Sequence, residues 1–352
     1  MTMPDRAVEP GGSSPSLKDL RFLAALPKGL APVLRQKTDV PLLMTTRPAV
    51  TRGADEGAPD NPTEVVARWR AEVEERVGKG QIHLPLLPQV ASQVLMLAGS
   101  ASVDAAQLSG LIHRDPALAG QVLQIANSPA YMSLMPIVSL QQAVARLGLN
   151  AVTEIALVAS MQSGTFKVPG YEADLKRLWR HAIASAVFAK EIARIRRSNV
   201  EAAFLCGLLH AVGKPALLQV VADVQLAQEK STASVRAVAG SGAIRAAVAD
   251  LLDALHVGVG LRIAEVWGLP RSVVAAIATY GCYDRTPGPT QEAAITCLAD
   301  RLATDLVEPG RFDETTLRDH PVFAHLNLYP DDVAGLLAKR AMVAGVVDSL
   351  TT

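Results

Sequence analysis

Short amphipathic segments, with apolar residues at steps of three and four, recur through most of this chain and are separated by proline, glycine and capping residues. Asp115 stands directly before Pro116, and Ser139 opens a segment that stops at Gly148, which are start and stop signals of helices. The apolar residues are mostly Ala and Leu, 4% of residues are aromatic, and alternating strand patterns are missing. We therefore expect an all-α fold with short connections.

The 352 residues divide into segments of different composition. Residues 1–60 are predicted to form a mobile tail, a small helical extension and a linker rich in Pro and Gly. The extension has a helical face too small to hold a core alone, so we expect it to dock elsewhere; that face is formed by Leu17, Leu20, Leu23 and Ala24. Among the helices expected further on are 172–196, 215–229, 243–254, 256–267, 271–280, 290–306 and 330–349.

A connecting amphipathic helix is predicted for residues 61–80, with Pro62 at its first position. One stripe of this helix is apolar, and the other faces carry Arg and Glu; the stripe consists of Val66, Trp69, Val73 and Val77. The stripe must be covered, either by packing within the chain or by a partner helix in an interaction surface. A homodimer through this face is part of the second alternative.

Charge and cysteine content restrict the function classes. The 34 basic and 34 acidic residues give a formal net charge of zero, which argues against a nucleic-acid binder. No uninterrupted apolar run reaches the roughly 18 residues of a membrane span, and no secretion signal follows the first residues. Three widely spaced cysteines predict buried reduced thiols and not a disulfide framework. We expect a cytoplasmic protein that does not bind membranes.

Three of the seven histidines fall where helices could bring them together. His181 lies on the predicted long helix, His210 ends an apolar helix, and His256 begins another. Asp300 is surrounded by apolar residues and is expected to point inward. Neutral imidazoles and a carboxylate are ligands of divalent metals, but a lone inward histidine is more often a hydrogen-bonded core residue. The spacing leaves both alternatives open.

The order of these motifs resembles the HD superfamily of metal-dependent phosphohydrolases and, more closely, the HDOD domain, an HD-related output domain of bacterial signalling proteins. The motifs are LWRH, FLCGLLHAVGK, HVGVGLRIAEVWGLP and ITCLADRLA, preceded by LPLLPQVASQVL, IHRDPALAGQVLQIANSPAY and IVSLQQAVARLGLNAV. The resemblance implies an HDOD domain over residues 81–281, with an N-terminal helical half. It also implies that residues 282–352 form a C-terminal helical extension that completes an HD-like bundle.

The sequence departs from the active HD pattern at one metal ligand. The resemblance assigns His181 to the first histidine, His210 to the second and Asp300 to the last aspartate. Ala211 stands where the metal-binding aspartate follows the second histidine, and a methyl group cannot coordinate a cation. Lys214 matches a lysine of the family pattern, and Thr279-Tyr280 replace a histidine pair found in many members. His256 belongs to the same set of vestigial positions.

We therefore expect no catalytic residues, no bound metal and no cofactor. The resemblance implies a non-catalytic regulatory module in second-messenger or two-component signalling. Its partner would be a signalling protein such as a diguanylate cyclase, phosphodiesterase, kinase or response regulator. The alternative is a divergent HD phosphohydrolase acting on a nucleotide second messenger. A third option, ligand sensing through residues 1–60, is disfavoured because that segment is too short for a cyclic-nucleotide-binding barrel.

Overall fold

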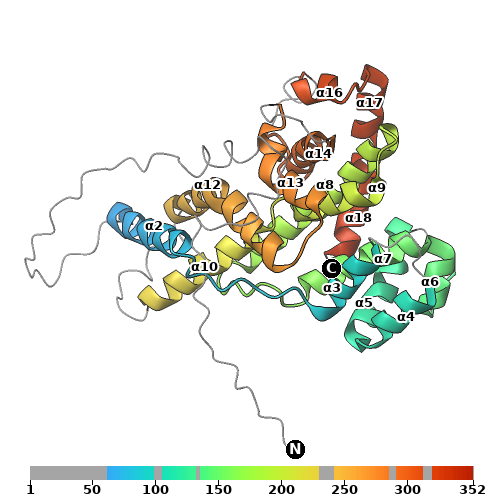
Figure 1. Ribbon diagram of the computed structural model, residues 1–352, viewed down its shortest axis with the longest axis horizontal. Coiled ribbons are helices and arrows are strands. Elements are labelled where there is room, and N and C mark those ends of the chain that lie inside the picture. The colour runs from blue at the N-terminus through green and yellow to red at the C-terminus, as the bar shows by residue number, and fades with distance from the viewer. Residues whose placement is uncertain are drawn as a thin grey trace, which may run out of the picture.

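The computed structural model describes residues 62–98, 105–131, 135–229, 242–284, 291–311 and 319–351. Every regular element in these ranges is a helix, which confirms the expected all-α fold (Figure 1). Residues 1–60, with the expected tail and helical extension, lie outside the described residues. The three cysteines are buried free thiols, as predicted; they are Cys206, Cys282 and Cys297.

The N-terminal half consists of short helices that pack around one buried helix (Figure 1). Its elements are α3 (Gln89–Ala98), α4 (Ala105–His113), α5 (Pro116–Ala126), the 3₁₀ turn η3 (Pro129–Tyr131), α6 (Leu140–Leu147) and α7 (Leu149–Gln162). The predicted caps are present: Asp115 accepts hydrogen bonds from two backbone N–H groups of α5, and Ser139 accepts one from α6. Gly148 adopts a φ of 85° between α6 and α7, which a residue with a side chain rarely adopts.

Asn127 fixes the long connection between α5 and α6. Its side-chain amide donates to the carbonyl oxygens of Leu123 and Ile137, both at 2.8 Å. Its carboxamide oxygen accepts from the backbone N–H of Ile137 at 2.7 Å. One side chain therefore bonds both backbone groups of Ile137 and holds residues 127 and 137 together.

The C-terminal half is built around the long helix α8 (Glu172–Ile195), which packs against α9 and α14 and is also contacted by α18. The other elements are α9 (Val200–Leu209), α10 (Gly213–Glu229), α12 (Gly242–Val266), α13 (Arg271–Thr279), the 3₁₀ turn η4 (Tyr280–Cys282), α14 (Gln291–Val307), α16 (Pro321–His325), α17 (Pro330–Ala338) and α18 (Arg340–Leu350). The stretch Val200–Ala227 is long and apolar enough to span a membrane by composition, yet 83% of the tested window is buried, as in a core helix.

Two predicted helix boundaries are wrong. The helices expected at 243–254 and 256–267 are one continuous helix, α12. His256 continues this helix because its Nδ1–H donates to the carbonyl oxygens of Leu252 and Asp253 within it. The single helix expected at 330–349 is divided at Lys339, which ends α17 and precedes α18. The Lys339 ammonium there forms an ion pair with the buried carboxylate of Glu191 on α8.

The apolar stripe of α2 (Pro62–Gly78) is covered within the chain. Trp69, Val73 and Val77 are 3%, 0% and 9% exposed, and α2 packs against α10 and α12. The side chain of Val66 lies outside those described. For Trp69, Val73 and Val77 the alternative of packing within the chain therefore holds, and the interaction surface does not include these three residues. The sequence could not decide between the two, because an amphipathic face does not name what covers it.

Candidate functional site

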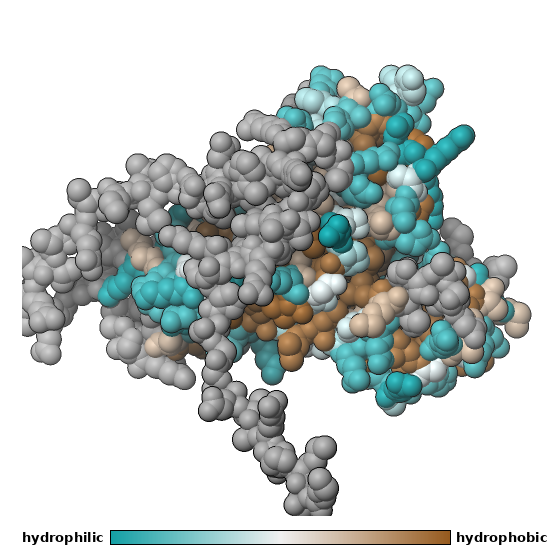
Figure 2. Space-filling model, in the orientation of Figure 1, coloured by the Kyte–Doolittle hydropathy of each residue, from teal (hydrophilic) through white to brown (hydrophobic). Residues whose placement is uncertain are grey.

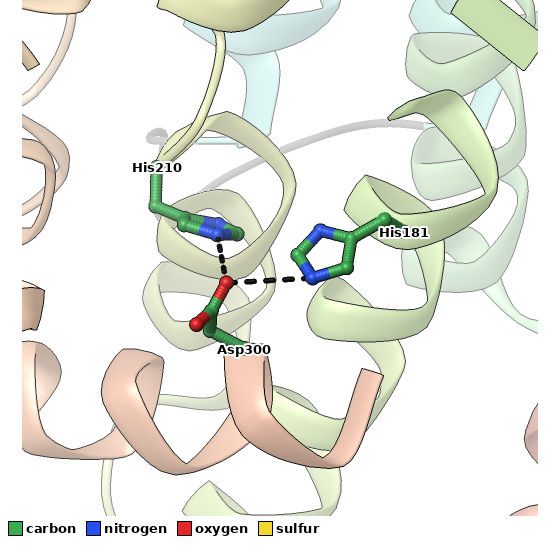
Figure 3. A group of neighbouring side chains, drawn as sticks. All are labelled: His181, His210 and Asp300. Carbon is green, nitrogen blue, oxygen red and sulfur yellow. Dashed lines mark hydrogen bonds and ion pairs between the residues drawn. The ribbon is translucent and has the colours of Figure 1, made fainter. Parts of the chain in front are cut away.

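Three side chains from three helices meet in the C-terminal half (Figure 3). His181 lies on α8, His210 follows the last residue of α9, and Asp300 lies on α14. The Oδ1 atom of Asp300 is 3.1 Å from Nε2 of His210 and 3.4 Å from Nε2 of His181. His210 is fully buried, whereas the Asp300 side chain is 28% exposed. The sequence named all three residues, and the fold brings them together.

Two glycines next to His210 allow the helices to approach closely enough to form this cluster. A Cβ atom on Gly207 would lie 2.5 Å from the carbonyl oxygen of Ser185 in α8. A Cβ atom on Gly213 would lie 2.0 Å from the carbonyl oxygen of His256 in α12. Ordinary contacts begin near 3.4 Å, so neither position accepts a side chain without a movement of backbone. The two glycines of GLLHAVGK thus allow the close approach of this segment to α8 and to α12.

Both ring nitrogens of His210 face acceptor groups. Its Nδ1 lies 2.8 Å from the carbonyl oxygen of Gly207, and a carbonyl only accepts, so Nδ1 carries a proton. Its Nε2 faces the carboxylate of Asp300 at 3.1 Å, and an ionised carboxylate also only accepts. The His210 ring thus links the carbonyl of Gly207 in α9 to the carboxylate of Asp300 in α14.

His181 donates in the same cluster. The hydroxyl of Thr304 donates to the backbone carbonyl of Asp300 at 2.8 Å, so its oxygen is free to accept. Nε2 of His181 lies 3.1 Å from that oxygen and therefore carries the proton that it shares between Thr304 and Asp300. Thr304 was not predicted. The only sequence signal for it is its position one helical turn after Asp300.

His256 reaches the cluster through Tyr280. Because Nδ1 of His256 donates within α12, its Nε2 accepts, and the Tyr280 hydroxyl donates to it at 2.8 Å. The Tyr280 ring lies edge-on to His210, with ring centroids 4.8 Å apart. Burial raises the pKa of the Tyr280 phenol well above its ordinary value and keeps the donor neutral. Tyr280, which stands where many family members have a histidine, thus links His256 to His210.

Burial is the main cause of the unusual pKa values of the histidines. It lowers the pKa of His181 to about 4, although the negative charge of Asp300 partly opposes the shift. Burial, together with the charge of Lys214, lowers the pKa of His256 to about 4. Burial raises the pKa of Asp300, but the hydrogen bond from His210 and the nearby positive charges outweigh it and hold that pKa well below its usual range. Asp300 is therefore ionised at neutral pH.

Lys214 and Ala211 are the remaining two of the predicted HD-site positions. The Lys214 ammonium lies 2.8 Å from a carboxylate oxygen of Asp253 on α12, and its side chain is 24% exposed. The half-buried Ala211 follows His210 and brings no donor atom. The lysine charge is thus already paired, and the second carboxylate of an active HD site is missing.

The residues match a metal site in type but not in number. One donor atom from each of His181, His210 and Asp300 lies within 4.8 Å of the others, and two imidazoles with one carboxylate can bind a single transition-metal ion. In the structure the Nε2 atoms of the two histidines contact Thr304 and Asp300. A hydrolytic centre with a second carboxylate does not fit, because no oxygen ligand stands at position 211.

Comparison with known proteins identifies the chain. The family profile of the HDOD domain matches residues 84–281. The chain belongs to the HDOD family. The resemblance of the motifs, which span almost the same residues, is thereby confirmed.

Solved structures of HDOD-like proteins have the same fold. An HDOD domain protein from Geobacter sulfurreducens is 22% identical with a TM-score of 0.60, over 82% of this chain and 99% of that chain. A structure from Shewanella amazonensis SB2B, named as a metal-dependent phosphohydrolase, is 18% identical with a TM-score of 0.57, over 81% and 99%. A signal transduction protein from Marinobacter aquaeolei VT8 is 21% identical with a TM-score of 0.57, over 84% and 68%. At these identities the likeness establishes the fold alone.

A curated relative from Treponema pallidum (strain Nichols), an uncharacterized protein, is 23% identical over 205 residues. The match covers 55% of this chain but 37% of the relative, so the chain spans little more than a third of that protein's length.

Proposed function

We propose that this HDOD protein is a non-catalytic signalling module that regulates a partner by contact. The observation that carries the proposal is Ala211, which directly follows His210 where an active HD site has its metal-binding aspartate. The one carboxylate that remains, Asp300, is hydrogen-bonded to His210 and within 3.4 Å of His181. The polar groups of the site therefore satisfy one another without a substrate.

The chemistry of phosphoester hydrolysis supports this proposal. A metal ion in such a site activates a water and neutralises phosphate, which requires open coordination positions and several anionic ligands. Here the carboxylate is already engaged, and His210 is fully buried. Lys214, the group best suited to contact a phosphate, is paired with Asp253. A substrate would have to break an ion pair and two hydrogen bonds before any reaction.

Membership of the HDOD family supports a role in signalling, and one structurally similar protein is named as a signal transduction protein. We propose a cytoplasmic module in second-messenger or two-component signalling that uses no cofactor. Its partner would be a diguanylate cyclase, a phosphodiesterase, a kinase or a response regulator.

The test is a turnover assay on the purified chain with Mg²⁺ or Mn²⁺. Cyclic dinucleotides, ppGpp and model phosphodiesters serve as substrates. We expect no product above the level of a His210→Ala control. Metal-dependent turnover that disappears in that control would refute the proposal.

The second candidate is a divergent phosphohydrolase, and the observation in its favour is the convergence of three donor atoms within 4.8 Å. This function predicts about one bound metal ion per chain by elemental analysis, since two imidazoles and one carboxylate can bind one ion. It also predicts that Ala211→Asp raises turnover. Under the favoured proposal the same substitution adds a carboxylate beside a site that has no activity to raise.

A further inference from the structure

Helix α18 lies between the two halves of the molecule (Figure 1). It packs against α8 of the C-terminal half and also contacts η3 and α7 of the N-terminal half. Among the described elements, no other helix of the C-terminal half packs as extensively on any element of the N-terminal half. The apolar face of α18 is buried; it consists of Val343, Val347 and Leu350.

Ion pairs fix the beginning of α18 to two helices of the C-terminal half. Lys339, the residue before α18, is paired with Glu191 of α8. Arg340, its first residue, is paired with Asp305 of α14. The side chains of the two acids are 5% and 12% exposed, so solvent screens these pairs less than pairs on the open surface. The beginning of α18 is therefore expected to follow a movement of α8 or α14.

Two of the residues that are paired with α18 stand next to the histidine cluster in the sequence. Arg180 of α8 lies 2.7 Å from Asp348, near the end of α18, and directly precedes His181. Asp305 directly follows Thr304, whose hydroxyl oxygen is 3.1 Å from Nε2 of His181. A change in the separation of α8 and α14 at the cluster therefore displaces a partner of α18 at each of its ends.

Other contacts between the halves start further from the cluster. The Lys190 ammonium of α8 is 2.6 Å from the carboxylate of Glu154 of α7, but Lys190 is about two and a half helical turns beyond His181. Asn150 of α7 donates to Glu201 at 2.7 Å, near the beginning of α9, whereas His210 follows the other end of that helix. These bonds hold the halves together without connecting them to the cluster.

We propose that α18 is a strap that couples the cluster of His181, His210 and Asp300 to the N-terminal half. Its paired ends carry a displacement of α8 against α14 to η3 and α7. On the face drawn in Figure 2, hydrophobic residues gather between the two halves, so a change in their spacing alters the apolar surface that is open to a partner.

This inference goes beyond the proposed contact function, because it assigns a conformational device to the fold and does not depend on whether the site turns over a substrate. The test measures the protection of backbone amides. Its failure is therefore distinguishable from product formation in the turnover assay above.

Hydrogen exchange of the full chain, followed by mass spectrometry, tests the strap. Arg180→Gln/Arg340→Gln removes one ion pair at each end of α18. We expect the amides of residues 128–131 and 149–162 to exchange about fivefold faster, because each partly exposed pair contributes a factor of roughly two to five. Arg177→Gln/Arg311→Gln is the matched control, since both of these arginines pair with Glu308 and not with α18. It should leave both regions unchanged.

A second variant tests the coupling to the cluster. Thr304→Val removes the hydroxyl that accepts from His181 and changes the side-chain volume little. We expect residues 128–131 to exchange about threefold faster in this variant, and no further change when it is combined with Arg180→Gln/Arg340→Gln. Thr296→Val is the matched control on the same helix, because the Thr296 hydroxyl donates within α14, to the carbonyl of Glu292 at 2.7 Å. It should leave residues 128–131 unchanged.

Three results would overturn the proposal. Equal exchange of residues 128–131 in the wild type and the arginine variant would mean that α18 does not hold the N-terminal half. An effect of Thr304→Val that persists in the arginine variant would mean that the coupling takes another route. Acceleration of the same size in residues 271–279 of α13, which packs against α9, α12 and α14, would report a loss of global stability instead of the release of one half.

Discussion

Gly207→Ala should destabilise the protein although alanine is the better helix former. Gly207 lies inside α9, where this helix crosses α8, and three residues before His210. An added Cβ atom would lie 2.5 Å from the carbonyl oxygen of Ser185 and 2.7 Å from Cα of Ala186. Both are backbone atoms, so no side-chain rotation relieves the contact. To restore ordinary separations near 3.4 Å, α9 must move away from α8 by almost 1 Å.

Two opposing contributions decide the size of the effect. Replacing an interior helix glycine with alanine stabilises a helix by about 1 kcal/mol. Overpacking of a close-packed interior costs about 1–3 kcal/mol, and the upper end applies where backbone meets backbone. We therefore expect the free energy of unfolding to fall by about 2 kcal/mol. Because His210 moves with the end of α9, the shift should also change its 3.1 Å contact with Asp300 on α14.

Urea unfolding followed by circular dichroism measures this change, and Gly258→Ala is the matched control. Gly258 lies in α12, and an added Cβ atom there would have no neighbour within 4 Å. The same substitution should therefore stabilise the protein by about 0.5–1 kcal/mol at that position. The reasoning is refuted if Gly207→Ala is as stable as the wild type, or if both variants shift the midpoint in the same direction.

Three further predictions concern charge and packing. Because burial lowers the pKa of His181 and of His256 to about 4, both bind protons more tightly when unfolded, so stability is complete above pH 7 and falls as pH drops towards 4. At pH 5 each should lower the free energy of unfolding by about 2 kcal/mol relative to pH 7.5 in urea titrations. His256→Gln should therefore remove about half of the combined difference. Trp69→Ala should lower the free energy of unfolding by about 3–5 kcal/mol because the side chain is buried, whereas Trp69→Phe keeps most of the packing and should lower it far less. Equal melting temperatures of the two variants would contradict the packing. Lys190→Met should cost about 2–3 kcal/mol because it leaves Glu154 of α7 without its partner at 2.6 Å, and the double variant with Glu154→Leu should recover most of that loss in a denaturant cycle.

Local signals were sufficient for most of the fold. Asp115 and Ser139 cap helices through bonds to residues two or three positions away, so the sequence alone contains both partners. The long apolar face of α8 likewise predicted its extent to within one residue. Of the two wrong boundaries, the one at Lys339 depends on a residue far away in the sequence. The division at Lys339 accompanies an ion pair with Glu191, which lies 148 positions earlier.

The candidate site was predictable as a set of residues but not as a network. The motifs named His181, His210 and Asp300, which the fold places together. They gave no sign that Thr304 would accept from His181 or that Tyr280 would join His256 to His210. Tyr280 lies in a different element from either histidine, and Thr304 lies one turn after Asp300 without a distinctive residue type. The directions of their hydrogen bonds depend on the packed structure.

The hydrogen bonds of the cluster determine which position can distinguish the two candidate functions. His210 and Asp300 form a hydrogen bond that joins α9 to α14, and removing either partner would leave the other without it. Such a pair stabilises the fold whether or not the protein has ever bound a metal ion. The survival of these two residues therefore says nothing about catalysis. Position 211 does, because a carboxylate there would supply the second anionic ligand that a hydrolytic metal centre needs. Ala211 is thus the residue on which the assignment to a contact module depends, and Ala211→Asp is the substitution that separates the two functions.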